Sequence, residues 1–346
     1  MLLLVSAAAV IFMVFGLALF YAGQSPERSV ANTLLMSFGA FAVVLPLWIF
    51  IGFNVAFDGD AADFKLFQGA FAVIATALIS GAVAARMKFS SWLMFAGTWS
   101  VVVYSVLVLW TWNPNGFLYK MGAIDLAGGG PIHIAAGASG IVLALLLGKR
   151  AARDLRQDVP LVILGAGILT FGWLFFNAGS VLEINETTYS VALNTMLAAA
   201  TGAFGWFMLD GIKHRRATAL SGASGAVAGL VAITPSAAVL SDWQAALLGV
   251  LTAAAVYGAL ELKNRLPVDD ALDVAAFHLI AGAVGSLYAG AATSWHQLGV
   301  QAIAVGSTVG YAAAITLLIG LWIKLTFGLR VAPEVESGGI DVLHTV

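Results

Sequence analysis

The stretch Ala123–Gly137, AIDLAGGGPIHIAAG, sets an aspartate, three consecutive glycines, a proline and a histidine within a long apolar region. A second stretch, Asp273–Leu287, reads DVAAFHLIAGAVGSL and again places a histidine shortly after an aspartate in apolar surroundings. Ionisable residues in membrane-spanning segments are costly, and they usually face a bundle interior or a polar path. The two stretches therefore predict a helical membrane protein whose function involves His133 and His278.

The composition of the whole chain agrees with this prediction. Of the 346 residues, 61% are hydrophobic and 10% are charged, whereas a soluble domain has about 25% charged residues. Apolar runs of about 20 residues recur along the chain, and each is expected to be a helix because lipid offers backbone groups no hydrogen-bond partner. We expect eleven spans, at residues 2–22, 31–54, 67–85, 90–111, 126–148, 160–180, 189–209, 217–239, 244–262, 271–291 and 300–328.

Other function classes lack the residues that they need. The absence of cysteine excludes disulfides, iron–sulfur clusters and thiolate zinc sites. A net charge of −2 provides no basic field for nucleic acid. Neither a phosphate-binding loop nor a nucleophile paired with a base is present. We therefore expect a protein that is not an enzyme and that has no cofactor.

The distribution of Lys and Arg predicts the orientation. Only Lys65 and Lys120 fall on one side of the expected membrane. The positive-inside rule makes the other side cytoplasmic, so the amino terminus is expected outside and the carboxyl terminus inside. The residues on the cytoplasmic side are Arg28, Arg86, Lys88, Lys149, Arg150, Arg153, Arg156, Lys213, Arg215, Arg216, Lys263, Arg265, Lys324 and Arg330.

The two histidines predict an internal repeat. They lie in the fifth and the tenth spans, and an odd offset reverses the chain direction, so the two halves are expected to form an inverted-topology repeat with the substrate path between them. Helix rise places His133 about 12 Å and His278 roughly 8 to 10 Å inside the bilayer, close enough to meet near its centre. The expected units are a membrane domain 1–328, with repeats at about 1–148 and 160–291 and an eleventh helix at about 300–328, and a tail 329–346.

Several uses of these residues remain open from the sequence alone. A histidine pair serves metal ligation, proton relay or a polar strip in an apolar passage, and the lack of further ligands disfavours metal. A lone histidine that bonds a neighbouring helix is the simplest alternative. Asp125 and Asp273 stand at expected helix starts, where a carboxylate caps free amides; for Asp125 the alternative is to stabilise a bound cation.

Aromatic residues and glycines add a second signal. Trp110 and Trp112 end the fourth span, and Trp173, Phe175 and Phe176 lie in the sixth. Such residues form either interfacial belts or a cluster that binds a cation by its ring faces. The 38 glycines favour close helix packing, and hence a narrow path for a small substrate.

These motifs resemble the ammonium transporter, methylammonium permease and Rhesus protein family, of the bacterial or archaeal type, over nearly the whole chain. The resemblance is to the family's fifth, sixth, seventh, eighth and tenth helices, and the third with the loop after it. The matching stretches are GAIDLAGGGPIHIAAGASG, FGWLFFNAGS, ALNTMLAAATGAFGW, SGASGAVAGLVAITP, DDALDVAAFHLIAGAVGSL and FQGAFAVIATALISGAVAARMKFSSW.

The resemblance implies eleven helices, a homotrimer in the inner (plasma) membrane and a pore in each protomer. The implied substrate is ammonium or ammonia, with methylammonium as a related one, and a cytoplasmic P-II signalling protein is an implied partner. The implied roles are an outer ammonium site of Trp112, Phe71 and Ser180, flanked by Trp173 and supported by Asp125; a gate of Phe71 and Phe176; a pore lined by His133 and His278; and a vestibule residue, Thr234.

The sequence departs from the family pattern at several positions. Gly130, Pro131 and Ile132 replace the usual Thr or Ser followed by two valines, so Pro131 is expected to bend the helix just before His133. Phe175 replaces a glycine and is expected to narrow the outer vestibule. The spacing from Trp112 to the following aspartate is one residue longer than usual, and the tail is an imperfect form of the family's regulatory tail.

The main rival function is an ammonium receptor of the same fold that binds without conducting. Receptor members carry appended signalling domains, and the sequence through Val346 contains none. Transport is therefore the favoured prediction.

Overall fold

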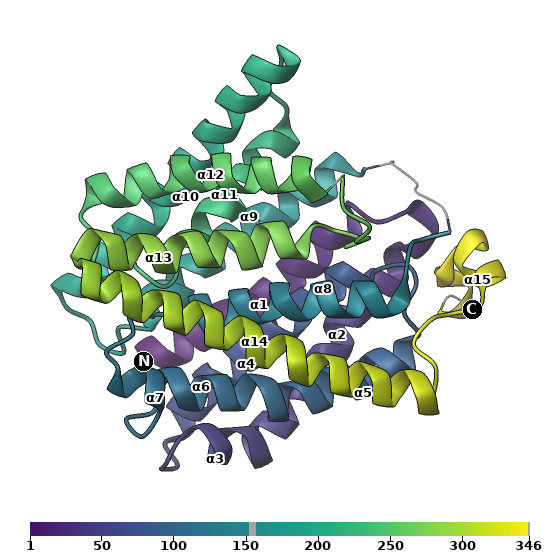
Figure 1. Cartoon of the computed structure of the whole chain (residues 1–346), viewed down its shortest axis with the longest axis horizontal. Coiled ribbons are helices and arrows are strands. Elements are labelled where there is room, and N and C mark those ends of the chain that lie inside the picture. Colours follow the sequence, from purple (N-terminus) through teal and green to yellow (C-terminus); the bar gives the residue numbers. More distant parts are fainter. Residues whose placement is uncertain (152–156, 264, 345–346) are drawn as a thin grey trace.

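The chain is all-helical in its computed structural model, which describes residues 1–151, 157–263 and 265–344 (Figure 1). Ten helical stretches among these residues are long and apolar enough to cross a membrane. The elements are α1 Leu2–Ala22, η1 Glu27–Ser29, α2 Val30–Leu47, η2 Trp48–Gly52, α3 Phe53–Ala56, α4 Ala62–Val83, α5 Phe89–Trp99, η3 Ser100–Tyr104, α6 Ser105–Trp112, α7 Phe117–Lys120, η4 Gly129–Ile134, α8 Ala135–Leu147, α9 Val159–Gly179, α10 Glu186–His214, α11 Ala219–Ile233, α12 Asp242–Lys263, η5 Ala275–Ile280, α13 Ala281–Thr293, α14 Trp295–Thr326, α15 Pro333–Gly338 and η6 Ile340–Leu343.

The predicted helical membrane fold is confirmed, but some boundaries were wrong. The eighth expected span, 217–239, contains the 15-residue helix α11 and then turns, because Pro235 cannot donate to a continuing helix. The fifth begins at Gly129 and the tenth at Ala275, each about one turn later than expected. Arg153 and Arg156, counted among the cytoplasmic cations, lie outside the described residues.

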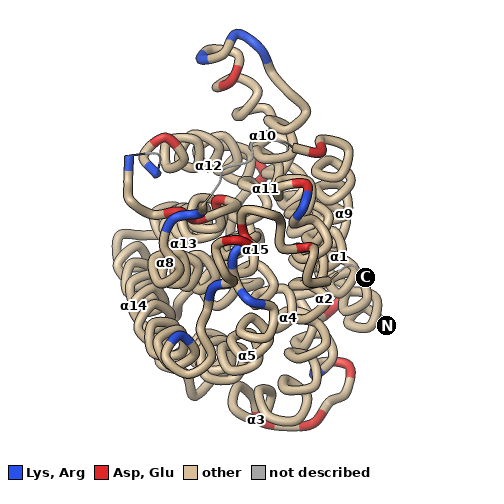
Figure 2. The backbone as a smooth tube through the Cα atoms, turned by 90° about the vertical axis from the view of Figure 1, so that its right-hand side faces the viewer, with Lys and Arg blue, Asp and Glu red and all other residues tan. Residues whose placement is uncertain are grey.

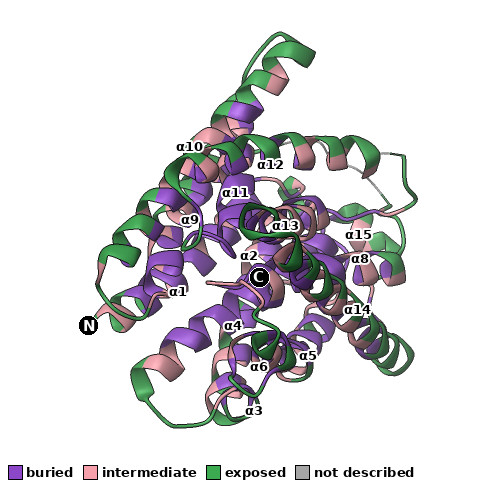
Figure 3. Ribbon diagram, turned by 60° about the vertical axis from the view of Figure 1, so that its left-hand side comes forward, coloured by how far each residue is buried: buried purple, intermediate pink, exposed green. Residues whose placement is uncertain are grey.

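Helix α4 is the centre of the bundle. Every residue from Phe67 to Val83 is buried, and Figure 3 shows buried residues gathered in the middle with exposed ones around the outside. α1 packs along α9, and α8 packs against η5. These pairs are the first and the last spans of the two predicted halves, so spans at equivalent positions contact each other.

Residues 327–344 pack on one end of the bundle, which we call the tail end (yellow in Figure 1). Figure 2 looks onto this end and shows Lys and Arg spread around α15. Asp341 in the tail accepts hydrogen bonds of 2.9 and 2.7 Å from two backbone amides in the first turn of α2. The tail therefore caps a helix whose N-cap residue, Ser29, makes no side-chain cap bond.

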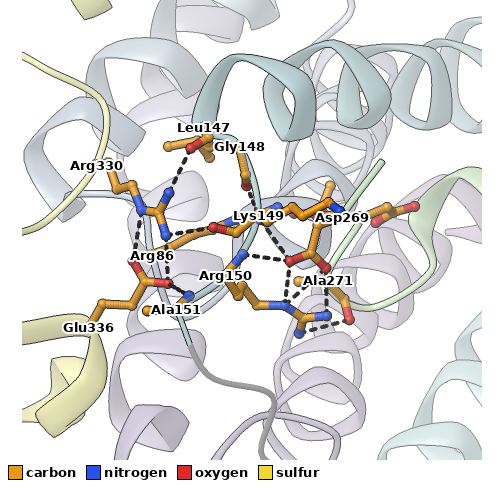
Figure 4. A network of polar contacts seen from close by, with 12 residues as sticks. Arg86, Leu147, Gly148, Lys149, Arg150, Ala151, Asp269, Ala271, Arg330 and Glu336 are labelled. Carbon is orange, nitrogen blue, oxygen red and sulfur yellow. Dashed lines mark hydrogen bonds and ion pairs between the residues drawn. The ribbon is translucent and has the colours of Figure 1, made fainter. Parts of the chain in front are cut away.

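A buried ion network joins three loops at the tail end (Figure 4). Asp269 accepts from Arg150 through Nη2 at 2.8 Å and through the backbone amide at 2.7 Å. Arg86, which is fully buried, lies 3.4 Å from the same carboxylate and donates to the carbonyl oxygen of Gly148 at 2.6 Å. The network thus fixes the loops that follow α4, α8 and α12.

The tail is tied to the same region by a second ion pair. Arg330 donates to Glu336 through Nε at 2.7 Å and to the carbonyl oxygen of Leu147 through Nη1 at 2.9 Å. Glu336 in turn accepts from the backbone amide of Ala151 at 2.7 Å. These bonds hold the first turns of the tail against the end of α8.

Folding shifts two pKa values in this network, and only the shift of Asp269 stabilises the folded chain at neutral pH. Burial alone raises the pKa of Asp269, but hydrogen bonds and charge from Arg150, with the charge of Arg86, outweigh it and lower that pKa to about 2. Burial lowers the pKa of Arg86 to about 10, and the charge of Asp269 opposes that change. Both groups are therefore ionised at neutral pH.

We expect acid to weaken the fold through Asp269. Its pKa falls from an ordinary 3.8 to about 2 on folding, so the unfolded chain binds the proton more tightly and stability is lost as pH falls from about 4 towards 2. Thermal unfolding of the detergent-solubilised protein between pH 5 and pH 3 measures this loss. Asp269→Asn should show a shallower decline than the wild type, and an equal slope in both proteins would contradict the assignment.

Candidate functional site

His133 and His278 are in contact at the centre of the bundle. Their Nδ1 atoms are 3.2 Å apart, and their rings stack with centroids 5.3 Å apart and planes at 11°. Both side chains are at most 4% exposed. One imidazole donates and the other accepts in such a contact, so the two rings must adopt complementary tautomers.

Each histidine lies in a six-residue π-helical segment, His133 in η4 and His278 in η5. A π-helical turn widens the helix by one residue and is frequent at functional sites. In η4, the backbone amide of His133 bonds the carbonyl oxygen of Gly128, five residues earlier, at 3.2 Å. This local widening sets the direction in which each ring leaves its helix.

A continuous column of aromatic rings leads to the histidines. Trp112 contacts Phe71 edge-on at 6.3 Å between ring centroids, and Phe71 packs against Phe176 at 4.3 Å. Phe176 is 6.2 Å from His133. The column crosses from the end of α6, through α4 and α9, to the stacked imidazoles.

A small cavity of about 20 Å³ opens beneath the phenyl pair. By this measure one water molecule needs about 10 to 15 Å³, so the space suits one or two small molecules. His133, His278, Trp173 and Phe176 line it, together with the ring of Tyr21 and apolar side chains from α1, α4, α9 and α11. Nε2 of His133 has no hydrogen-bond partner among the described residues.

Asp125 caps the helix that carries His133. Its Oδ1 accepts from the amides of Gly128 and Gly129 at 2.7 and 2.8 Å, and its Oδ2 accepts from the amide of Gly130 at 2.7 Å. Gly128 has φ +105, a value that favours glycine. A Cβ at Gly129 would lie 2.7 Å from Pro235, so a second glycine is required by packing. Of the two predicted uses of Asp125, capping is present in the structure.

The expected bend at Pro131 does not occur as predicted. The helix starts at Gly129, so Pro131 is its third residue and lies in the first turn. Amides in the first turn have no partner within the helix, so a proline there sacrifices no hydrogen bond. The prediction was wrong because it started the helix at residue 126.

The predicted cap by Asp273 is also wrong. Asp273 pairs with Lys263 at the tail end, and the carboxylate of Asp270 accepts from the amide of Ala275 at 2.7 Å instead. Asp273 has φ +62, so the chain turns at this residue before η5 begins. The sequence offered three nearby aspartates, and the turn decides which of them faces the free amides.

The remaining predicted residues form the surroundings of the column. Trp112 donates from Nε1 to the carbonyl oxygen of Asp125 at 2.8 Å, and Trp173 donates to Thr234 Oγ1 at 2.8 Å. Ser180 donates to the carbonyl oxygen of Phe176 at 2.9 Å, which holds the hydroxyl beside the end of α9. Each indole therefore has a fixed orientation.

Phe175 lies outside the cavity beside the histidines, and its predicted narrowing of the outer vestibule stays a prediction. Its ring is 5.3 Å from that of Phe171, which is exposed on the outer face of α9, and Phe175 is not among the residues that line the cavity. Along a helix, residues 171 and 175 share one face, whereas Trp173 and Phe176 face inwards. The larger side chain thus extends away from the imidazoles.

Tyr21 was missed by the sequence analysis. Its hydroxyl donates to the carbonyl oxygen of Leu78 at 3.0 Å, and its ring lines the cavity. A tyrosine at the end of an apolar span is typical of an interfacial belt, so the sequence contains no signal that separates the two cases.

The sequence pattern of the Ammonium Transporter Family matches residues 1–65 and 58–345 of this chain. The ammonium transporter of Aquifex aeolicus (strain VF5) is 40% identical, with 99% of this chain and 91% of that protein aligned. The ammonium transporter of Bacillus subtilis (strain 168) is 34% identical, with 97% and 94% aligned.

Solved structures share the fold. One described as a Sensor Amt Protein has a TM-score of 0.94 and 25% identity, with 100% of this chain and 97% of that chain covered. Mep2 of Saccharomyces cerevisiae has a TM-score of 0.88 and 29% identity, with 96% and 86% covered. Since the sequence pattern, the relatives and the fold agree over nearly the full length, this chain belongs to the Ammonium Transporter Family.

Proposed function

We propose that this protein transports ammonium through a narrow apolar pore in each protomer. An ammonium ion binds at the outer end of the ring column, beside Trp112, Phe71 and Ser180. It gives up a proton there to water at the outer mouth of the pore, and ammonia then passes the Phe71–Phe176 gate to the paired histidines. The observation that carries the proposal is the column of rings in contact from Trp112 to the two imidazoles.

The column suits this task because it separates ammonium from potassium. The two ions have similar size and charge, so a size filter does not discriminate between them. An apolar cavity imposes a high desolvation cost on any ion, but ammonium alone escapes that cost by giving up a proton. His133 and His278 then offer the only imidazole partners along the cavity lining of the described residues. The imidazole that donates from Nδ1 in the pair has an unprotonated Nε2, which accepts a hydrogen bond from ammonia, and the other imidazole donates to ammonia from Nε2.

Supporting residues hold the outer site in shape. Asp125 keeps Trp112 and η4 in place through its carbonyl oxygen and its carboxylate, and its negative charge favours a cation nearby. Trp173 and Thr234 brace the rings from the side of α9 and α11. The proposal therefore assigns Asp125 a structural and an electrostatic role together.

The proposal extends to topology and assembly. We infer eleven spans, with α11 as the eighth, an inverted repeat plus a final helix, the amino terminus outside, and the tail end in the cytoplasm. The contacts between α1 and α9 and between α8 and η5 support the repeat, and the cations at the tail end support the orientation. A homotrimer in the plasma membrane and binding of a P-II signalling protein remain predictions from the family resemblance.

Flux in proteoliposomes tests the proposal. Purified protein in sealed vesicles should give an ammonium-evoked current or a luminal pH change that an equal potassium gradient does not evoke. The similarity to a structure described as a Sensor Amt Protein favours a second candidate, a receptor that binds without conducting. Calorimetric binding of ammonium without any flux in either assay would support that receptor and exclude transport.

A further inference from the structure

Gln301 is a fully buried glutamine in α14, outside the ring column and the cavity. Its Oε1 accepts from the backbone amide of Ile124 at 2.8 Å, and its Nε2 donates to the carbonyl oxygen of the same residue at 2.8 Å. Nε2 also donates to Ser286 Oγ at 2.8 Å. A single side chain thus satisfies both backbone groups of one loop residue.

This arrangement fixes the position and the direction of the Ile124 backbone. The carboxamide of glutamine has one acceptor and two donor hydrogens, and Ile124 and Ser286 use all three functions in this structure. Two parallel bonds resist rotation as well as displacement. Because Gln301 is on α14 and Ser286 on α13, the loop is held against two helices at once.

Ile124 directly precedes Asp125, and the constraint passes along the chain from there. The carbonyl oxygen of Asp125 accepts from the indole of Trp112, and its carboxylate holds the start of η4. A shift of Ile124 therefore moves the acceptor that orients Trp112. The same shift moves the cap of the helix that carries His133.

We propose that Gln301 is a positioning residue for the outer cation site, acting through Ile124 and Asp125 on the indole of Trp112. The inference rests on the proposed function, because it takes the end of the ring column at Trp112 to be where ammonium binds. Gln301 itself touches neither the substrate nor the cavity. Replacing Gln301 should therefore change the ammonium concentration at half-maximal flux more than it changes the maximal flux.

Gln301→Met tests the inference, since methionine preserves the volume and removes all three hydrogen-bonding functions. The concentration of ammonium at half-maximal flux should rise about tenfold, the factor expected for the net loss of roughly one hydrogen bond, while the maximal flux changes less than twofold. In a Trp112→Phe background the same substitution should add less than a twofold change, because the indole through which it acts is absent.

Gln297→Met is the matched control. Gln297 lies one turn earlier on the same helix and donates to the carbonyl oxygen of Gly122 in the same loop at 2.8 Å, but it is only partly buried and makes one bond to that loop instead of two. Because it holds the loop by one bond only, its replacement should change the ammonium concentration at half-maximal flux less than twofold. Equal effects of Gln297→Met and Gln301→Met would overturn the inference.

Gln301→Glu is the second test variant, to be used if Gln301→Met does not fold. Glutamate retains an acceptor for the Ile124 amide and loses both donors, so half-saturation should again rise in the wild-type background and not with Trp112→Phe. Fully additive effects of Gln301 and Trp112 substitutions would overturn the inference. Absence of flux in the wild type would overturn the proposed function instead, and the same double-mutant cycle would then be measured as ammonium binding by calorimetry.

Discussion

The double variant His133→Leu, His278→Leu should lose about 99% of its ammonium-evoked flux. Both imidazoles line the cavity, and leucine leaves a passage in which a guest finds no histidine partner. If each lost hydrogen bond raises the barrier by about 1.5 kcal/mol, the two together raise it by about 3 kcal/mol, or roughly 100-fold in rate. Ammonium flux and current in proteoliposomes measure the change.

His296→Leu provides the control for this pair. His296 is exposed at the start of α14, so its replacement should leave flux at the wild-type level. Potassium flux should stay at background in all three proteins, because the phenyl pair above the cavity is unchanged. Wild-type ammonium flux in the double variant would show that the imidazoles are not on the path.

Asp125→Ala should lower both stability and flux. The carboxylate accepts from the amides of Gly128, Gly129 and Gly130, and hydrogen bonds to a charged group are each worth about 1.5 to 3 kcal/mol. Alanine leaves these buried donors unpaired, so we expect a loss of at least about 3 kcal/mol in the free energy of unfolding. Thermal unfolding in detergent and flux in vesicles measure the two effects.

Asp58→Ala and Asp125→Asn separate capping from attraction of the cation. Asp58 is exposed in the loop between α3 and α4. Its replacement by alanine removes a negative charge at the same end of the bundle without removing a cap, so the unfolding temperature and the flux should change little. Asparagine at position 125 keeps one acceptor oxygen, so the stability and the flux of Asp125→Asn should lie between those of the wild type and those of Asp125→Ala. A normal unfolding temperature in Asp125→Ala, with weakened ammonium binding, would indicate that only the charge matters.

The positions of the two histidines were predictable from the sequence, and their local geometry was not. Their places in the fifth and tenth apolar spans, combined with helix rise, predict a meeting near the centre of the bundle. The π-helical turns η4 and η5 that aim the rings have no signal in the sequence, because a π-helical turn arises from packing and not from a residue preference.

The residues that cap η4 and η5 were also only partly predictable from the sequence. Asp125 lies three residues before the first of its glycines and has no other carboxylate near it, so capping by Asp125 was one of the two uses that the sequence predicted. Before η5 the sequence offers three nearby carboxylates, Asp269, Asp270 and Asp273. Ion pairs formed after folding distinguish them: Arg86 and Arg150 pair with Asp269, and Lys263 pairs with Asp273. Only Asp270 remains for the helix start, and these pairings are invisible until the loops meet.

The packing of α1 along α9 has a consequence for biosynthesis. α1 ends at Ala22 and α9 begins at Val159, so the ribosome adds more than a hundred residues between the two helices, which takes roughly 10 to 30 s at ordinary elongation rates. During that time α1 is in the bilayer without its main neighbour, with Ser6 and other small side chains facing lipid or a chaperone. Shortening this wait, for example by supplying residues 157–344 as a separate chain made beforehand, should raise the yield of correctly inserted protein.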